Sequence, residues 1–200
     1  MNGGNGQNEY SIFVFIMITF LAPNISIATI ADIPVITDLL NTAYRGEASK
    51  KGWTTEAHLI SGNQRTDQNN VAELIYKPGS VFLKYTQEDN QIVGCVNLQQ
   101  HDNKIYLGML SVTPILQGAG IGKKLLFAAE EYANTLQCTS IYMSVISIRN
   151  ELINWYERFG YSDTGERKPF VEDGISGKHL QPMEFMILEK NVSSLNNHLI

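Results

Sequence analysis

The chain is poor in the residues that bind metals or form cross-links. Its two cysteines, Cys95 and Cys138, lie far apart, and its four histidines are scattered singly. Structural zinc sites need closely spaced ligands, and disulfide frameworks need several cysteines. We therefore predict no metal site, and we expect both thiols to be free and buried, which suits a reducing compartment.

Positive charge is also scarce. The 200 residues include 15 Lys and Arg against 20 Asp and Glu, which gives a net charge of −5 at pH 7. A nucleic-acid-binding surface needs a stripe of basic side chains that neutralises phosphates and releases counterions. This composition argues against a nucleic-acid partner. The length suits one globular domain of ordinary size.

The main apolar run, residues 11–22, is too short for a comfortable membrane span, which needs about 20 residues. Its length suits the core of a signal peptide, and Ser26 to Ala28 resembles a cleavage site. No Lys or Arg precedes the run, however, and cleavage after Ala28 would destroy the first expected strand. A natural start at Met17 is an alternative. We predict a cytoplasmic protein, with secretion or membrane association as the competing interpretation.

These features divide the chain into three parts. Residues 1–24 are predicted to be an N-terminal extension, polar and then apolar, outside the fold. Residues 25–190 are predicted to form one domain, and residues 191–200 a C-terminal tail. The sequence leaves the oligomeric state open, a homodimer included.

What the chain does contain is a glycine-rich loop. Gly118, Gly120 and Gly122 alternate directly after a strand-like apolar pattern, and an amphipathic helix pattern follows at once. The first amides of a helix have no partner inside the helix, and the helix dipole favours negative charge there. The segment therefore predicts a binding site for a phosphorylated ligand.

Spacing separates the known phosphate-binding loops. The dinucleotide pattern G-x-G-x-x-G fails, because its third glycine would fall on Lys123 or Leu125. The P-loop pattern fails at both ends, on Gln117 and Lys124. A third pattern, Q/R-x-x-G-x-G/A, fits at Gln117, Gly120 and Gly122.

This third pattern resembles the pyrophosphate loop of the GNAT superfamily of acetyl-CoA-dependent N-acetyltransferases. A second block strengthens the resemblance, because Asn150 to Tyr161 looks like the family's N-x-x-A-x-x-x-Y-x-x-x-G-F/Y segment. Two departures are small, since Ile153 stands where alanine is frequent and Tyr161 where phenylalanine is commoner. The resemblance covers about residues 25–190.

The resemblance implies a mixed α/β fold of the GNAT type, with a mostly antiparallel central sheet of six to seven strands flanked by about four helices. Hydrophobic periodicity and turn signals agree with this order. Strands are expected at residues 25–30, 80–86, 91–100, 104–112, 141–146, 161–166 and 183–189. Helices are expected at residues 33–45, from Thr54 or Thr55, at 71–76, at 121–136 and at 150–160.

The resemblance also implies a donor site for acetyl-CoA, used as co-substrate without a metal. A bulge in the strand ending at Val112 would free backbone groups, and one N–H, placed at Leu110, would polarise the acetyl carbonyl. The residues implied to bind the donor are Leu110, Ser111, Val112, Gln117, Gly118, Ala119, Gly120, Ile121, Gly122, Lys123, Asn150 and Tyr156.

Tyr156 aligns with the tyrosine that protonates the departing CoA thiolate in many members of the family. A phenol with a pKa near 10 stays protonated at neutral pH and can do this. Its competing interpretation is a core residue on the apolar face of its helix. For Asn150, the alternative is an ordinary residue of a first helical turn.

The resemblance implies transfer of an acetyl group to a primary amine of a small molecule or a protein by direct attack. The alternative is a non-catalytic CoA-binding module of the same fold, because the strand at residues 104–112 lacks a glutamate that could serve as base. Arg45 and Trp53 are predicted to bind the acceptor, on a polar and aromatic loop. Glu47, Glu56 and Glu73 are read as solvated surface charges.

Overall fold

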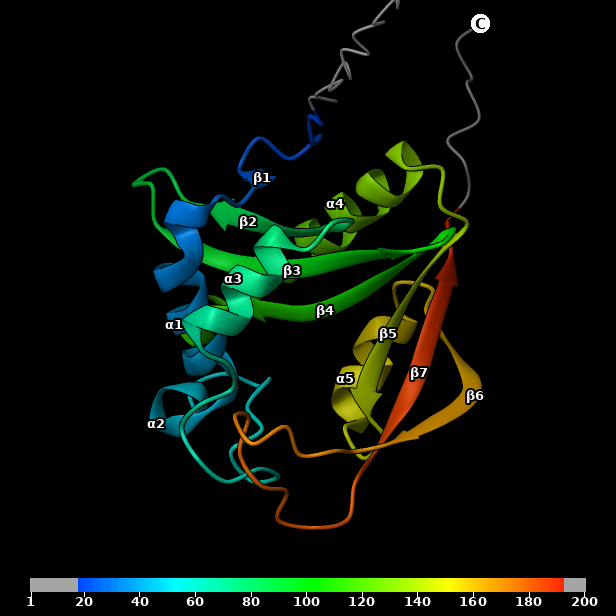
Figure 1. The fold of residues 1–200 in the computed structure, drawn as a ribbon. Helices are drawn as coiled ribbons and strands as arrows, with labels where there is room; N and C mark the ends of the chain where they lie inside the picture. Colours follow the sequence, from blue (N-terminus) through cyan, green and yellow to red (C-terminus); the bar gives the residue numbers. More distant parts are fainter. Residues whose placement is uncertain (1–17, 193–200) are drawn as a thin grey trace, which may run out of the picture.

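A computed structural model describes residues 18–192, which form a twisted central sheet with helices on both faces (Figure 1). The strands are β1 (Ile25–Ile27), β2 (Ser80–Thr86), β3 (Ile92–His101), β4 (Lys104–Val112), β5 (Ser140–Ile146), β6 (Ser162–Pro169) and β7 (Glu184–Asn191). The α-helices are α1 (Ile33–Tyr44), α2 (Gly46–Ser49), α3 (Gln68–Tyr76), α4 (Ile121–Thr135) and α5 (Asn150–Glu157). Short 3-10 turns cover Ile30–Asp32 and Pro114–Leu116.

The sheet order is β1-β2-β3-β4-β5-β7-β6, and β4 with β5 is its one parallel pair among the described strands. The predicted mixed, mostly antiparallel sheet is therefore confirmed, at seven strands. Asn90 and Asp102 adopt positive φ angles of 66° and 52° at the β2–β3 and β3–β4 turns. Both residue types tolerate this left-handed conformation, which explains the tight turns between these antiparallel strands.

Each face of the sheet has its own core. Neighbouring strand residues point to opposite faces, so Phe82 packs with the side chains of α1 and α3, while Leu83 packs with those of α4 and α5. Likewise, Cys95 lies in the same core as Phe82, and Val96 lies in the same core as Leu83. Both cysteines are free and buried, as predicted.

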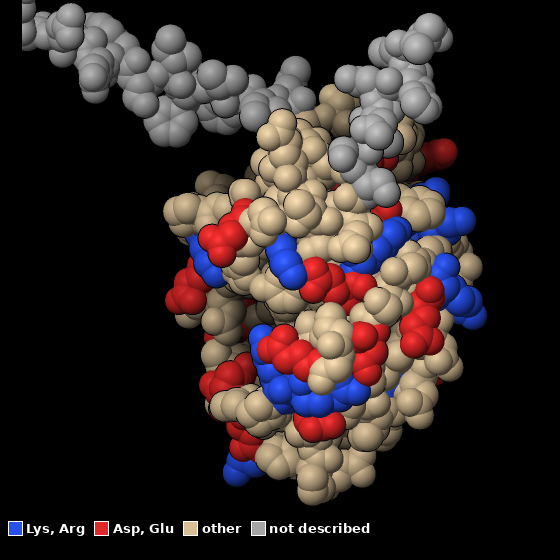
Figure 2. Space-filling view, turned by 90° about the vertical axis from the view of Figure 1, so that its right-hand side faces the viewer, with Lys and Arg blue, Asp and Glu red and all other residues tan. Residues whose placement is uncertain are grey.

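Charged side chains of both signs mingle on the face that carries β6 and β7 (Figure 2). Ion pairs tie several of them together, with N–O distances of 2.7 Å for Lys104 with Glu189 and 2.7 Å for Arg167 with Asp163. In the part of the chain that the structure covers, no helix has both the length and the apolar character for a membrane crossing. Most of the predicted apolar run, residues 11–17, and residues 193–200 of the predicted tail lie outside the described residues.

Three local expectations need correction. The helix predicted from Thr54 or Thr55 is wrong, because these residues lie in a loop and the short helix α2 lies earlier, at Gly46–Ser49. The Thr55 hydroxyl pairs with that of Ser49 at 2.7 Å instead of capping a helix. The first strand ends at Ile27, short of the predicted residue 30.

Helix α3 begins at Gln68, three residues earlier than predicted. The Asp67 carboxylate accepts a 2.8 Å hydrogen bond from the Asn70 amide and so caps the helix. A side-chain cap supplies a partner that the first amides otherwise lack, which fixes the start of the helix upstream of its apolar positions.

Strands β4 and β5 separate along their length. They pair only through residues 104–106 of β4 and 140–142 of β5. Beyond this pairing β4 carries a bulge: Gly108 pairs with Asn97 and Ser111 with Cys95, so two residues of β4 stand opposite one of β3. Met109, at the bulge, has a positive φ of 54°. The predicted bulge is therefore present, and together with the separation of β4 from β5 it opens the sheet beside α5.

Candidate active site

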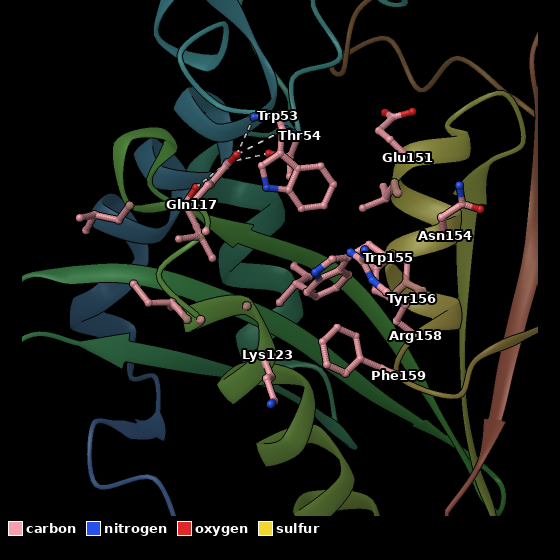
Figure 3. A pocket seen from close by; sticks show the side chains of 18 of the residues that line it. Trp53, Thr54, Gln117, Lys123, Glu151, Asn154, Trp155, Tyr156, Arg158 and Phe159 are labelled. Carbon is pink, nitrogen blue, oxygen red and sulfur yellow. Dashed lines mark hydrogen bonds between the residues drawn. The ribbon is translucent and has the colours of Figure 1, made fainter.

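A cavity of about 670 Å³ lies where β4 and β5 separate, a volume typical of small-molecule sites. Figure 3 shows its side chains converging from the loop after α2, the glycine loop and α5. The lining residues are Tyr44, Trp53, Thr54, Leu110, Val112, Leu116, Gln117, Gly118, Gly120, Ile121, Gly122, Lys123, Glu151, Leu152, Asn154, Trp155, Tyr156, Arg158 and Phe159.

The glycine loop forms one end of this cavity. Gly118 and Gly120 have φ angles of 90° and 82°, a left-handed conformation that glycine adopts without strain. Gly120 is the N-cap of α4, and no side chain caps the helix there. A Cβ at either glycine would meet nothing within 4 Å, so the loop backbone is open on this side.

The first turn of α4 therefore suits an anion. The first intrahelical bond runs from the Lys124 amide to the Gly120 carbonyl, at 3.1 Å. The preceding amides have no partner inside the helix, and α4 has no acidic residue in its first turn. Lys123 lines the cavity, whereas the Lys124 ammonium lies over the ring of Tyr85, 5.2 Å from its centroid. These groups fit the diphosphate of a CoA ester.

Tyr156 also lines the cavity, on α5, and is 6% exposed. Its ring meets those of Trp155 and Tyr161 edge to face, with centroids 5.0 and 5.8 Å apart. Burial, followed by the nearby Tyr44 and Tyr161 hydroxyls, raises the Tyr156 pKa well above the usual 10. This raised pKa keeps the Tyr156 hydroxyl protonated at neutral pH. No described residue forms a hydrogen bond with the hydroxyl, so its proton is available for transfer.

Tyr44, which the sequence did not single out, reaches the β4 bulge from the end of α1. Its hydroxyl donates a 2.7 Å hydrogen bond to the Leu110 carbonyl oxygen. Burial, with a smaller contribution from Glu56, raises the pKa of Tyr44 to about 12, so the phenol keeps its proton. The buried apolar face of α1 ends at Ala43, one residue before Tyr44. Helical periodicity therefore gave no sign that Tyr44 reaches the cavity.

Of the two residues predicted to bind the acceptor, one lines the cavity and the other does not. Trp53 lines the cavity, and its indole lies 6.0 Å from that of Trp155. Arg45 does not line it: the side chain is buried, its guanidinium pairs with Glu56, and it donates a 3.2 Å bond to the Ser176 carbonyl. This placement does not suit the predicted contact with an acceptor carboxylate. The prediction of a solvated Glu56 is wrong, because this residue is 9% exposed.

Not every residue expected at the donor site reaches the cavity. Ser111, Ala119 and Asn150 are absent from its lining, and Asn150 is exposed at the start of α5. The residue before it, Arg149, is buried and was not foreseen. It donates to the carbonyls of Trp53 and Thr54, at 3.4 Å each.

Glu151 is the carboxylate among the described lining residues. Partial burial is the largest single influence and opposes its ionisation, but the hydrogen bond from Arg149, a backbone hydrogen bond and the charge of Arg149 together outweigh it and hold the pKa of Glu151 below its usual value. A carboxylate so stabilised is a weak base. The described residues also contain no cluster of three or more His, Cys, Asp or Glu able to hold a metal.

Comparison with known proteins identifies the family. The family model described as "Acetyltransferase (GNAT) family" matches residues 35–161. The chain belongs to the GNAT acetyltransferase family. The match spans the glycine loop and all of α5, the two blocks on which the sequence resemblance rested.

Curated relatives give a more distant comparison. The spermine/spermidine N(1)-acetyltransferase of Bacillus subtilis (strain 168) is 30% identical over 95 residues, which is 46% of this chain and 62% of that protein. The N-acetylaspartate synthetase of Danio rerio is 26% identical over 125 residues, 61% of this chain and 44% of that protein. The aligned part of the chain thus spans less than two thirds of the length of either relative.

Solved structures share the fold. The ribosomal-protein-S18-alanine N-acetyltransferase of Escherichia coli matches with a TM-score of 0.63 at 14% identity, over 88% of this chain and 97% of that one. The ribosomal-protein-alanine N-acetyltransferase of Brucella melitensis matches with a TM-score of 0.63 at 20% identity, over 84% and 98%. These similarities establish the GNAT architecture of the sheet and its helices.

Proposed function

We propose that this protein is an N-acetyltransferase that moves an acetyl group from acetyl-CoA to a primary amine. One observation carries the proposal: the unpaired amides at the start of α4 and the Tyr156 side chain line a single cavity. A donor with a diphosphate at one end and a thioester at the other needs an anion site and a proton donor within one cavity.

The donor would lie along this cavity. The main chain from Gln117 to Lys123 would hold its diphosphate, and the gap between β4 and β5 would take the pantetheine arm. When bound, acetyl-CoA supplies the activated acetyl thioester. Holding the thioester beside an amine can lower the barrier by several kcal/mol through orientation alone, by about 7–11 in the best intramolecular cases.

The reaction itself needs few side chains. The amine nitrogen attacks the thioester carbonyl carbon, a C–N bond forms, and the C–S bond breaks. We assign the Leu110 N–H to polarise the carbonyl oxygen, since Leu110 lies in the β4 bulge, where the regular pairing with β3 is interrupted. Tyr156 gives its proton to the departing thiolate, and the amine loses its proton to water or another base.

The high pKa of Tyr156 makes it a weak acid, which bears on this step. An ordinary thiol has a pKa near 8.5, so free transfer from such a phenol would be uphill. The thiolate would be desolvated by the same aromatic surroundings, which raises its own proton affinity. Transfer as the C–S bond breaks is therefore feasible inside this cavity.

The acceptor is either an amine of a small molecule or an amine of a protein. The names of similar proteins suggest three probes for a first panel: spermidine, aspartate and a peptide that begins with alanine. Purified protein is mixed with acetyl-CoA and each amine, and the release of free thiol is measured. Amine-dependent thiol release supports the proposal.

A non-catalytic CoA-binding module is the second candidate, favoured by one observation. The carboxylate that lines the described cavity, Glu151, is bound to Arg149 and is a poor base. Tight CoA binding with no thiol release across the panel would favour the module. Absence of CoA binding would contradict both candidates.

A further inference from the structure

We propose that Gln117 is a positioning residue that ties the acceptor-side segment, residues 52–54, to the donor loop, so that donor binding orders the acceptor wall. This inference rests on the proposed function. It assigns to Gln117 a task performed by its side chain, distinct from the main-chain contact with a diphosphate.

The side-chain amide of Gln117 is fully used. Its Oε1 accepts hydrogen bonds from the main-chain amides of Trp53 (2.8 Å) and Thr54 (3.4 Å). Its Nε2 donates to the Thr54 hydroxyl (2.8 Å) and to the Val112 carbonyl (3.1 Å). Figure 3 shows these bonds running from the glycine loop to Trp53 and Thr54. One side chain therefore bridges the end of β4, the donor loop and the acceptor segment.

The chemistry of this position requires an amide. The loop pattern allows glutamine or arginine here, but a guanidinium has no acceptor atom and could not receive the Trp53 and Thr54 amides. Gly52 is matched to the same contact, because a Cβ there would lie 2.5 Å from Gln117 Oε1. Gly52 does not have a left-handed φ, so its backbone conformation does not require glycine. Glycine is needed here because a larger residue would collide with the Gln117 side chain.

The opposite side of the segment is held by Arg149. Its guanidinium donates to the carbonyls of Trp53 and Thr54, and it lies 3.9 Å from the Glu56 carboxylate. The amides of the segment are thus bound by the donor loop and its carbonyls by the residue that precedes α5. The Trp53 indole, which faces Trp155 across the cavity, is placed by both.

A functional consequence follows from this arrangement. Gln117 stands in the loop that would bind the diphosphate, so a donor that fixes the loop also fixes Trp53 and Thr54. Coupling between two sites is reciprocal, so the acceptor should in turn bind more tightly to the donor-loaded protein than to the empty one.

The first experiment uses Trp53 as its own reporter. The chain has two tryptophans, so Trp155→Phe leaves Trp53 as the sole indole. In this background we expect Gly52→Ala to change the emission maximum of Trp53 and its quenching by acrylamide in the ligand-free protein, because the added methyl displaces the Gln117 amide. Thr54→Val should do the same by removing the hydroxyl that Gln117 binds.

Thr55→Val is the matched control, since the Thr55 hydroxyl lies against Ser49 and not Gln117. It should leave Trp53 emission as in the background protein. Thermal melting of each variant verifies folding. Gly52→Ala should still fold, because the atoms it meets belong to the far end of one side chain, but it should melt below the parent because the displaced Gln117 amide loses hydrogen bonds. Unchanged Trp53 emission and quenching in both folded variants, Gly52→Ala and Thr54→Val, would overturn the inference even if CoA does not bind.

The second experiment measures coupling in the otherwise native chain. The acceptor KM is measured with the amine of the panel that releases most thiol, and the CoA Kd is measured by calorimetry. Gly52→Ala should raise the acceptor KM about five-fold while the CoA Kd changes less than two-fold. An unchanged acceptor KM beside normal CoA binding contradicts the positioning role. If the parent protein does not bind CoA, this contradicts the proposed function instead. The contacts of Gln117 are then tested by the fluorescence experiment only.

Discussion

The Tyr44 hydroxyl donates a 2.7 Å hydrogen bond to the carbonyl oxygen of Leu110, and so joins the end of α1 to the bulge of β4. The bulge residue before it, Met109, holds a left-handed φ of 54°, which is uncommon for a side chain of this size. A residue in such a conformation persists only when its surroundings hold it there. Tyr44 supplies one such contact, at the place where the acetyl group would be polarised.

Removing that contact should lower turnover. Tyr44→Phe keeps the ring and deletes the hydroxyl, so we expect kcat to fall about ten-fold while the CoA Kd changes little. Stability should drop by about 1 kcal/mol, the usual net value of one hydrogen bond. Steady-state kinetics, calorimetry with CoA and urea unfolding test this. An unchanged kcat would show that the bulge does not depend on Tyr44.

Tyr156→Phe tests the proton donor. A positioned general acid contributes about 10² to 10⁴ in rate, so we expect a fall of that order in kcat with a CoA Kd close to that of the parent. Equal turnover by the variant and the parent removes Tyr156 from the chemistry.

The pH dependence of Tyr156 has a definite sign. Its pKa lies well above 10, so the acid form is present throughout the neutral range and is lost only as pH rises through that value. Activity should therefore show no loss attributable to this group between pH 6 and about pH 9, relative to its usual pKa of 10. A descending limb of log kcat below pH 9 that disappears in Tyr156→Phe would contradict the assignment.

The sequence predicted the fold better than the site. Alternating apolar residues and hairpin turns gave β2 and β4 their correct bounds, because strand periodicity is a local property of the chain. The glycine loop was equally readable, since its conformation needs glycine at particular positions. By contrast, the helix predicted to start at Thr54 or Thr55 is absent, because the side chains of these two residues form tertiary contacts with Gln117 and Ser49.

Buried charge was the least predictable feature of the site. Arg45 was predicted to bind the acceptor and Glu56 to be a solvated surface charge, and Arg149 was not foreseen, yet the structure gathers all three in one ion-pair network. Their partners come from segments about 10 to 130 residues apart, so no local pattern reports them. Long-range packing decides their role, and periodicity cannot show it.

Gly120→Val tests the diphosphate cradle. The valine side chain would project where the loop backbone is open, so CoA binding should be abolished within the range of calorimetry. Its φ of 82° also costs a side chain about 1–2 kcal/mol of stability. Gly165→Val is the matched control, because Gly165 has the same φ of 82° and the same open surroundings on β6. The control should lose similar stability and keep CoA affinity; unchanged affinity in Gly120→Val would refute the location of the donor site.

Glu56→Ala tests the buried network beneath the acceptor loop. The carboxylate lies between two guanidiniums whose side chains are 1% and 2% exposed. Its removal leaves the buried Arg45 guanidinium without an acidic partner, whereas Arg149 keeps Glu151. Breaking a buried pair in this way costs about 3–5 kcal/mol, whereas an exposed pair contributes about 0–1. Glu47→Ala provides the comparison, because Glu47 pairs with Lys50 on the surface. Urea unfolding should show a large loss for the first variant and almost none for the second; equal losses would mean that the network does not stabilise the loop.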